Sequence, residues 1–256
     1  NPQGQASKRM RILGVIPARF ASTRFPAKPL VDIAGQTMIE RVYRQVKKSK
    51  SISKVIVATD HQRIFDHVRT FGGEVCMTSE LHDSGTDRCF EVLTKEKDKF
   101  DYVVNIQGDE PFIVPEQIDL LASLLDGKTE LATLAKKIED QEQLFSPHIV
   151  KVVADKTGKA LYFSRSPIPH IRNVTQDQWL NKHNFYRHIG MYAYRADILE
   201  NITKLSVSPL EKAESLEQLR WLENGYAIHV SETTHETIGI DTPEDLEKAI
   251  QFLTHN

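Results

Sequence analysis

The sequence has few cysteines. Its 256 residues include two, Cys76 and Cys89, with no CxxC spacing and no neighbouring His/Cys cluster. This pattern excludes a scaffold built on disulfides and argues against a structural zinc site. It fits a protein of a reducing compartment, and we therefore expect a cytoplasmic location.

Long apolar runs and an excess of charge of one sign are also missing. No stretch of about 18 apolar residues occurs, so we expect no contact with a membrane. Thirty-three Lys+Arg stand against 35 Asp+Glu, for a net charge of -2. The chain thus has no overall basic field for nucleic acid, and any anion site must be local. The polar opening NPQGQASK lacks the apolar core of a signal peptide, and we expect residues 1–10 to form a flexible tail.

Short β-rich runs alternate with helical patterns in the first half of the chain. The runs RILGVI, KVIVAT, EVCMT and YVVNIQ are each followed by a segment with a 3.6-residue apolar period, such as TMIERVYRQVKK. Repeated βαβ units predict an α/β fold with a mostly parallel central sheet and helices on both faces. Ligands of such sheets bind beyond the carboxyl ends of the strands.

The second half changes character. HIVKVVADKTGKALYFS predicts a hairpin and FYRHIGMYAYR another extended segment, which together indicate a β-rich insertion at about 150–195. One helix over PLEKAESLEQLRWLENG, strands at AIHVS and TIGI, and a final helix from Pro243 follow. Because no linker rich in Gly, Ser or Pro divides the chain, we expect residues 11–256 to form a single domain that carries this insertion.

The segment VIPARFASTRFPAKPL forms a basic loop after the first strand. Its three prolines remove backbone donors and prevent a helix or a central strand. Arg19, Arg24 and Lys28 can therefore fold around one anion such as phosphate. A solvated charged loop is the alternative. No glycine lies between Gly14 and Gly35, so neither the dinucleotide fingerprint nor the P-loop is present.

The segment NIQGDEP has a similar design. An apolar strand ends in Gly108, Asp109 and Glu110. Carboxylates at a strand end suit Mg²⁺ beside phosphates, whereas an ordinary Gly-Asp-Glu-Pro turn is the plainer interpretation. The residues alone leave both open.

Taken together and in order, the segments from about residue 11 to 250 are more specific. Eight segments closely resemble, in this order, those of the 3-deoxy-D-manno-octulosonate (Kdo) cytidylyltransferases, also called CMP-Kdo synthetases. They are VIPARFASTRFPAKPL, VATDH, GGEVCMTSELHDSGTDR, NIQGDEP, VKVVADKTGKALYFSR, RHIGMYAYR, PLEKAESLEQLR and GIDTPEDLE. The resemblance implies a Rossmann-like nucleotidyltransferase fold. It also implies formation of CMP-Kdo and pyrophosphate from CTP and Kdo, with Mg²⁺, for lipopolysaccharide inner-core synthesis. The partners would be CTP, the sugar acid and, as is common in the family, a second copy of the chain in a homodimer.

The same resemblance assigns roles to individual residues. It makes Arg19, Arg24 and Lys28 contacts of the CTP triphosphate, and Asp109 and Asp241 the metal ligands. We assign Arg19 and Lys28 to the phosphates near the reaction centre and Arg24 to the outer phosphates. The positions implied for the nucleotide and acceptor pockets are Ser84, Gly85, Thr86, Arg88 and Gln107, and those for the acceptor sugar are Gln107, Arg165, His188, Tyr192, Glu217 and Gln218. Phe20 and Phe25 depart from a more usual tyrosine and leucine.

Two classes of alternative remain at this stage. One is cytidylyl transfer to a close Kdo variant, such as an 8-amino analogue, or another sugar-activating nucleotidyltransferase for sialic acid or a sugar 1-phosphate. The last two usually carry a glycine in the opening loop, which this chain lacks. The other class is a nucleotide sensor that keeps the fold without the chemistry. Two separated carboxylates and three cations argue against a sensor.

Overall fold

The computed structural model describes residues 9–236 and 238–255, so most of the expected tail lies outside the described residues. The strands are β1 (Ile12–Pro17), β2 (Asp32–Ile33), β3 (Gln36–Thr37), β4 (Lys54–Thr59), β5 (Val75–Met77), β6 (Tyr102–Asn105), β7 (Leu131–Lys137), β8 (Lys151–Ala154), β9 (Ala160–Ser164), β10 (Tyr186–Arg195) and β11 (Ile228–Glu232). The helices are α1 (Met38–Lys47), α2 (Gln62–Thr70), α3 (Gly85–Lys95), α4 (Pro115–Ala122), α5 (Gln141–Phe145), α6 (Trp179–Lys182), α7 (Ala196–Thr203), α8 (Pro209–Glu214), α9 (Gln218–Glu223) and α10 (Pro243–Thr254), with 3₁₀ turns η1 (Lys28–Leu30) and η2 (Gln176–Gln178).

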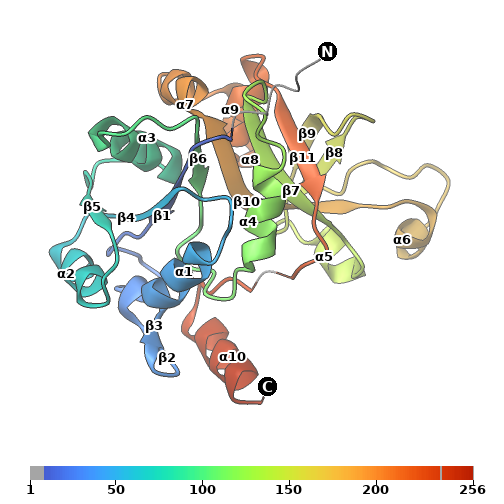
Figure 1. Cartoon of the computed structure of the whole chain (residues 1–256). Coiled ribbons are helices and arrows are strands. Elements are labelled where there is room, and N and C mark those ends of the chain that lie inside the picture. The colour runs from blue at the N-terminus through green and yellow to red at the C-terminus, as the bar shows by residue number, and fades with distance from the viewer. Residues whose placement is uncertain (1–8, 237, 256) are drawn as a thin grey trace, which may run out of the picture.

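One mixed sheet organises the chain (Figure 1). Its strands follow the order β11-β7-β10-β6-β1-β4-β5, and β8 and β9 attach to it through β10. All neighbours along that order are parallel except β10, which runs antiparallel to both β6 and β7. The mostly parallel sheet predicted from the alternating runs is therefore confirmed.

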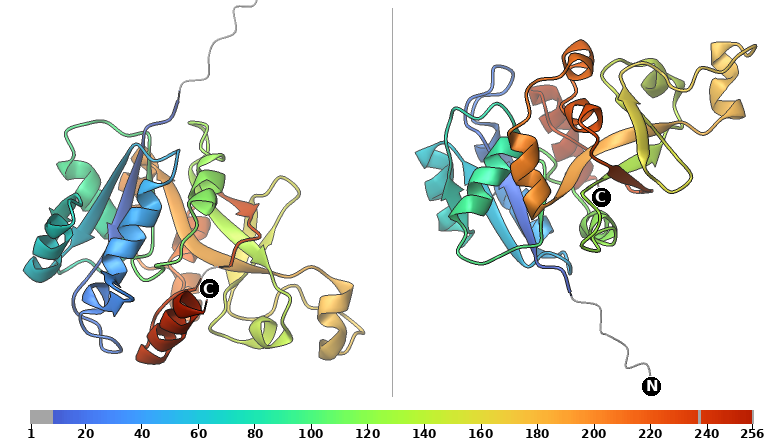
Figure 2. Two further views of the ribbon diagram at one scale, coloured as in Figure 1. Left: turned by 60° about the horizontal axis from the view of Figure 1, so that its bottom comes forward. Right: turned by 90° about the horizontal axis from the view of Figure 1, so that it is seen from above.

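Helices cover both faces of this sheet, as the two turned views show (Figure 2). Side chains alternate along β1: Ile12 and Ile16 enter a core with α1, α2 and α4, whereas Leu13 and Val15 enter a second core with α3, α7 and α9. This period of two is what a strand buried on both faces requires. Among the described residues, no helix is both long and apolar enough to cross a membrane.

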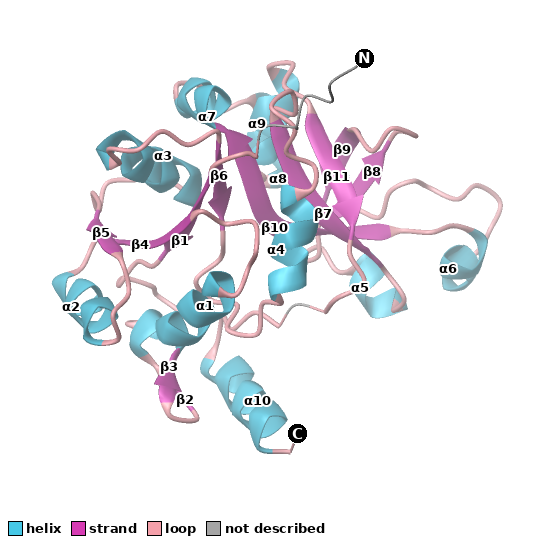
Figure 3. Cartoon of the chain, in the orientation of Figure 1, coloured by secondary structure: helices cyan, strands magenta, loops and turns pink. Residues whose placement is uncertain are grey.

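The segment predicted as an insertion, residues 150–195, lies partly in the main sheet and partly outside it (Figure 3). The hairpin β8–β9 forms as expected, and the segment that carries α6 runs out beyond the sheet. The strand β10, however, lies inside the main sheet between β6 and β7. It brings Tyr192 level with Asn105, the last residue of β6.

Two predicted elements are wrong. The helix expected over residues 209–225 is split into α8 and α9 at Ser215, whose φ of 55° is left-handed. The N–H of the buried Leu216 closes α8 by donating to the Glu211 carbonyl, 3.2 Å away. The strand expected at TIGI does not form at residues 238–240, and Thr237 lies outside the described residues. Ile240 N–H instead makes one bond, of 2.9 Å, to the Asp109 carbonyl, without a ladder.

Candidate active site

The basic loop folds back over the carboxyl end of β1. The Phe20 N–H donates to Asp60 Oδ1 at 3.2 Å, and the Phe20 ring stacks on His61 with centroids 3.8 Å apart. Asp60 and His61 follow β4, the neighbour of β1. The loop is thus held at both strand ends, with Lys28 at the start of η1.

Lys28 lies between two carboxylates. Its Nζ is 3.2 Å from Asp109 Oδ2 and 3.7 Å from Asp241 Oδ1. Gly108 permits this meeting, because a Cβ at that position would lie 2.6 Å from the Pro17 carbonyl oxygen. The bond from Ile240 to Asp109 brings the segment before α10 alongside, so loops far apart in sequence converge on one ammonium group.

The electrostatics of this cluster favour a further cation. Burial raises the pKa of Asp109, the negative charge of Asp241 adds to the rise, and Lys28 opposes it. Burial also raises the pKa of the neighbouring Glu110 to about 7, helped by Asp109 and opposed by Arg187. Carboxylates with raised pKa values are short of positive charge.

The residues present fit a magnesium ion that arrives with a nucleotide. Mg²⁺ is commonly held by one or two carboxylates together with substrate phosphates, and Asp109 and Asp241 supply such a pair. In the described part of the chain, no group of three His, Cys, Asp or Glu side chains is placed to hold a metal unaided. Phosphate oxygens would have to complete the coordination.

A cavity of about 640 Å³ opens beside this cluster. Its walls come from the basic loop, the loop after β6, the N-terminus of α3, and β10. The predicted site residues that line it are Arg19, Arg24, Lys28, Ser84, Gly85, Thr86, Arg88, Gln107, Asp109, Tyr192, Glu217 and Asp241. Sequence segments far apart thus supply one continuous pocket.

A second wall of the cavity holds the uncharged side chains of Thr86, Asn105, Tyr192 and Tyr194, which we call the neutral wall, beside the carboxyl group of Glu217. Thr86 Oγ1 donates to Glu217 Oε1 at 2.7 Å and lies 3.0 Å from the Tyr194 hydroxyl. Asn105 Nδ2 donates to the same hydroxyl at 3.2 Å. Burial raises the pKa of Glu217. Asn105 and Tyr194 are not among the predicted site residues, although the two-residue spacing of Tyr192 and Tyr194 on one strand indicates a shared face.

Tyr192 differs from the other members of this wall. Its hydroxyl is buried and has no hydrogen-bond partner among the described residues. A buried unpaired hydroxyl costs free energy, so such groups commonly mark a place where a ligand or water completes the bonding. Tyr192 lines the cavity, and a polar ligand there would supply the missing partner.

Three predicted sugar contacts do not line the cavity: Arg165, His188 and Gln218. The Arg165 guanidinium donates to the carbonyls of Glu214, Ser215 and Pro147, which holds the break between α8 and α9. His188 Nε2 lies 2.9 Å from Thr133 Oγ1, and burial lowers the pKa of this histidine to about 3. Its ring packs against Tyr192, with centroids 5.1 Å apart.

Gln107 and Arg88 do line the cavity, but protein groups already occupy part of their bonding capacity. Gln107 Nε2 donates to the Gly190 carbonyl at 3.0 Å. The buried Arg88 donates to Thr78 Oγ1 and to the Ser79 carbonyl, at 2.6 and 3.0 Å. Arg88 therefore braces the loop that precedes α3 as well as facing the pocket.

The chain is similar to known proteins over nearly all of its length. The sequence pattern of a family described as Cytidylyltransferase matches residues 13–252. The 3-deoxy-manno-octulosonate cytidylyltransferase of Cytophaga hutchinsonii is 57% identical over 241 residues, which cover 94% of this chain and 96% of that protein. The protein of the same name from Parabacteroides distasonis is 55% identical, covering 96% of this chain and 99% of the relative. A solved CMP:2-keto-3-deoxy-manno-octonic acid synthetase complexed with CTP superposes with a TM-score of 0.89 at 42% identity, covering 96% of this chain and 99% of that one.

Proposed function

Because the chain belongs to the cytidylyltransferase family, we propose that it joins CTP and Kdo to give CMP-Kdo and pyrophosphate. The product would be the activated sugar for lipopolysaccharide inner-core synthesis. The names of the similar proteins support this substrate pair. The observation that carries the proposal is the meeting of Lys28, Asp109 and Asp241 in one cavity with the basic loop and the neutral wall.

In this reaction the C2 hydroxyl of Kdo attacks the α-phosphorus of CTP, the bond to the bridging oxygen breaks, and pyrophosphate leaves. Arg19 and Lys28 would stabilise the negative charge near the reacting phosphorus, and Arg24 the outer phosphates. Asp109 and Asp241 would hold Mg²⁺, which when bound neutralises phosphate charge and lowers the pKa of the sugar hydroxyl. Catalysis then depends mainly on positioning and electrostatics.

The neutral wall suits the sugar. The Tyr192 hydroxyl lacks a partner among the described residues and can bond an oxygen of the sugar acid. The Glu217 carboxyl group, which bonds Thr86 and interacts with Ser84, lies beside this wall, and Gln107 lines the same cavity. Arg165 would act indirectly by fixing the break before α9, and His188 would do so by packing against Tyr192. The buried Gln218 begins α9 and has no proposed contact with the sugar.

Pyrophosphate release with purified protein, CTP, Kdo and Mg²⁺ tests the proposal. We expect turnover that requires all three, that stops in excess EDTA, and that falls strongly when a neutral hexose replaces Kdo. Undiminished turnover in EDTA, or equal rates with the hexose, would contradict it. An 8-amino Kdo analogue assayed beside Kdo identifies the preferred acceptor.

The proposal extends to location and assembly. Both cysteines are free, which fits a reducing cytoplasm. We propose a homodimer formed through residues 150–195, where Leu161 of the hairpin strand β9 is 61% exposed. Sedimentation analysis of the protein and of Leu161→Glu tests this: a dimer that dissociates in the variant is expected, and a monomeric wild-type protein contradicts it.

A further inference from the structure

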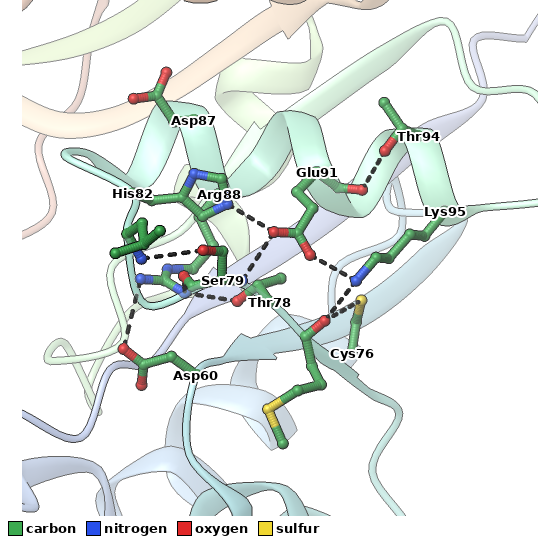
Figure 4. Close-up of polar contacts among 12 residues, drawn as sticks. Asp60, Cys76, Thr78, Ser79, His82, Asp87, Arg88, Glu91, Thr94 and Lys95 are labelled. Atoms are coloured by element: carbon green, nitrogen blue, oxygen red, sulfur yellow. Dashed lines mark hydrogen bonds and ion pairs between the residues drawn. The ribbon is translucent and has the colours of Figure 1, made fainter.

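The loop between β5 and α3 forms one edge of the nucleotide pocket. His82, Asp83 and Ser84 from this loop line the cavity, and Ser84 caps α3 by accepting the Asp87 N–H. Neither the resemblance nor the reaction assigns a role to His82. Figure 4 shows how side chains of α3 reach back to hold the loop that precedes them.

Glu91 is the centre of that arrangement. Its Oε1 accepts the Ser79 N–H at 2.9 Å and lies 2.7 Å from His82 Nε2 (Figure 4). Its other oxygen, Oε2, is 2.6 Å from Lys95 Nζ. One carboxylate oxygen therefore holds the loop, while the other pairs with a lysine one turn along the helix.

The charge state of Glu91 fixes the role of the His82 ring. Burial raises the pKa of Glu91, but bonds from Lys95, Ser79 and His82 outweigh it and lower the value to about 2. An ionised carboxylate only accepts, so His82 Nε2 must donate. No other group of the described chain bonds the remaining ring nitrogen, Nδ1. That nitrogen is left for a ligand in the cavity that His82 lines.

We propose that His82 is a further contact for the nucleotide and that Glu91 is the positioning residue that holds it there. The inference rests on the proposed function, since it takes a cytidine nucleotide as the ligand. Nδ1 of a neutral ring accepts a hydrogen bond from an amino or hydroxyl group, and Nδ1–H of a charged ring donates to a phosphate oxygen. Either bond would add to nucleotide affinity.

The loop has a second brace that does not depend on Glu91. Arg88 bonds Thr78 Oγ1 and the Ser79 carbonyl, at 2.6 and 3.0 Å. Loss of Glu91 therefore leaves the start of the loop held and releases the part that carries His82. The effect on CTP should follow His82 rather than the folding of the whole protein.

CTP affinity measured by calorimetry on folded variants tests the inference. We expect Glu91→Ala and His82→Ala each to weaken CTP binding about tenfold, as for the loss of one good hydrogen bond. Glu91→Gln keeps an acceptor at Oε1 and should stay within about threefold of wild type. Thr94→Ala, the matched control on the same helix, removes a hydroxyl that bonds the backbone carbonyl of Glu91 and should leave CTP affinity unchanged.

The double variant separates positioning from a general structural role. If Glu91 acts through His82, Glu91→Ala combined with His82→Ala binds CTP no more weakly than His82→Ala alone. Additive losses, or unchanged CTP affinity in Glu91→Ala despite a lower Tm, would overturn the inference. Failure of wild-type protein to bind CTP would instead count against the proposed function.

Discussion

The two walls of the cavity are built on different principles. On one side, which we call the charged wall, Lys28 forms ion pairs with Asp109 and Asp241, and the Asp241 side chain is 63% exposed. On the other, Thr86, Tyr194 and Asn105 form a neutral, buried network. The charged wall is held by ion pairs that phosphates and metal would replace, whereas the neutral wall is held by bonds that can persist when a ligand binds.

This difference separates chemistry from recognition. The side chains of the charged wall can exchange their ion pairs for contacts with phosphate and metal, and can thereby stabilise the negative charge that develops on the phosphates. The bonded network of Thr86, Tyr194 and Asn105 is rigid, and a wall of this kind selects a ligand by shape and hydrogen bonding. Changes to the charged wall should therefore reduce turnover with little loss of stability. Changes to the neutral wall should alter substrate affinity, and stability wherever they leave a group unpaired.

Asp241→Asn should give the largest effect, a loss of activity on the order of 10²- to 10³-fold, because it removes one of two metal-binding charges. The Tm should stay unchanged or rise. The α10 cap does not use the Asp241 carboxylate, since Thr242 Oγ1 accepts the Asp245 N–H and Asp245 Oδ2 accepts the N–H groups of Asp241 and Thr242. Thermal unfolding and pyrophosphate release on the same sample measure both quantities.

Thr242→Ala is the matched control for Asp241→Asn. It removes the capping hydroxyl and should cost about 1 kcal/mol of stability while sparing most of the activity per folded molecule. Early unfolding of Asp241→Asn with full activity per folded molecule would make Asp241 a structural residue and disprove its metal role.

Lys28→Ala should lower kcat/KM by about 10²-fold, as for the loss of one preorganised charge beside the phosphates. It also leaves Asp109 and Asp241 without their shared cation. Steady-state kinetics with varied CTP gives the value. A loss of kcat/KM below about threefold would indicate that Lys28 is a solvated loop residue without a phosphate contact.

Tyr192→Phe tests the neutral wall at the point where bonding is incomplete. The variant removes a hydroxyl that has no partner within the described chain, so stability should stay the same or rise, while KM for the sugar rises about tenfold. Its control is Tyr194→Phe, which removes the partner of Thr86 and Asn105 and should cost about 1–2 kcal/mol of stability. Equal Tm changes in the two variants would contradict the distinction.

The smallest expected effect is a pH-dependent change in stability when Glu91, at the edge of the pocket, is replaced. Bonds to Glu91 hold its pKa at about 2 in the folded protein against an ordinary value of 4.5. The ionised form is therefore favoured by folding, and its contribution to stability is present above pH 4.5 and lost as pH falls toward 2. Urea unfolding should show a stability deficit of Glu91→Gln at pH 7 that narrows below pH 4.5. A deficit independent of pH would exclude the charge as its cause.

Much of the charged wall could be predicted from the sequence, because local features create it. Prolines force the loop that carries Lys28, and a short apolar strand delivers Gly108 and Asp109 to the sheet edge. The resemblance added Asp241. The ion pairs themselves could not be predicted from the sequence, since Lys28 and Asp109 are 81 residues apart and meet only in the folded chain.

The neutral wall was harder to predict because long-range pairing creates it. The insertion of β10 between β6 and β7 places Tyr192 opposite Asn105, and no local pattern encodes that register. The break at Ser215 was missed because the Arg165 guanidinium, 50 residues away, holds its carbonyl. The burial that lowers the pKa of His188 to about 3 likewise comes from the folded chain and not from its sequence neighbours.

A crystal structure with CTP and Mn²⁺ in place of Mg²⁺ tests the central claim most directly, because the anomalous signal locates the metal. We predict a peak within about 2.5 Å of carboxylate oxygens of both Asp109 and Asp241, with Lys28 bonded to phosphate oxygens. A metal bound to the phosphates alone, with Lys28 still between the two carboxylates, would contradict the account.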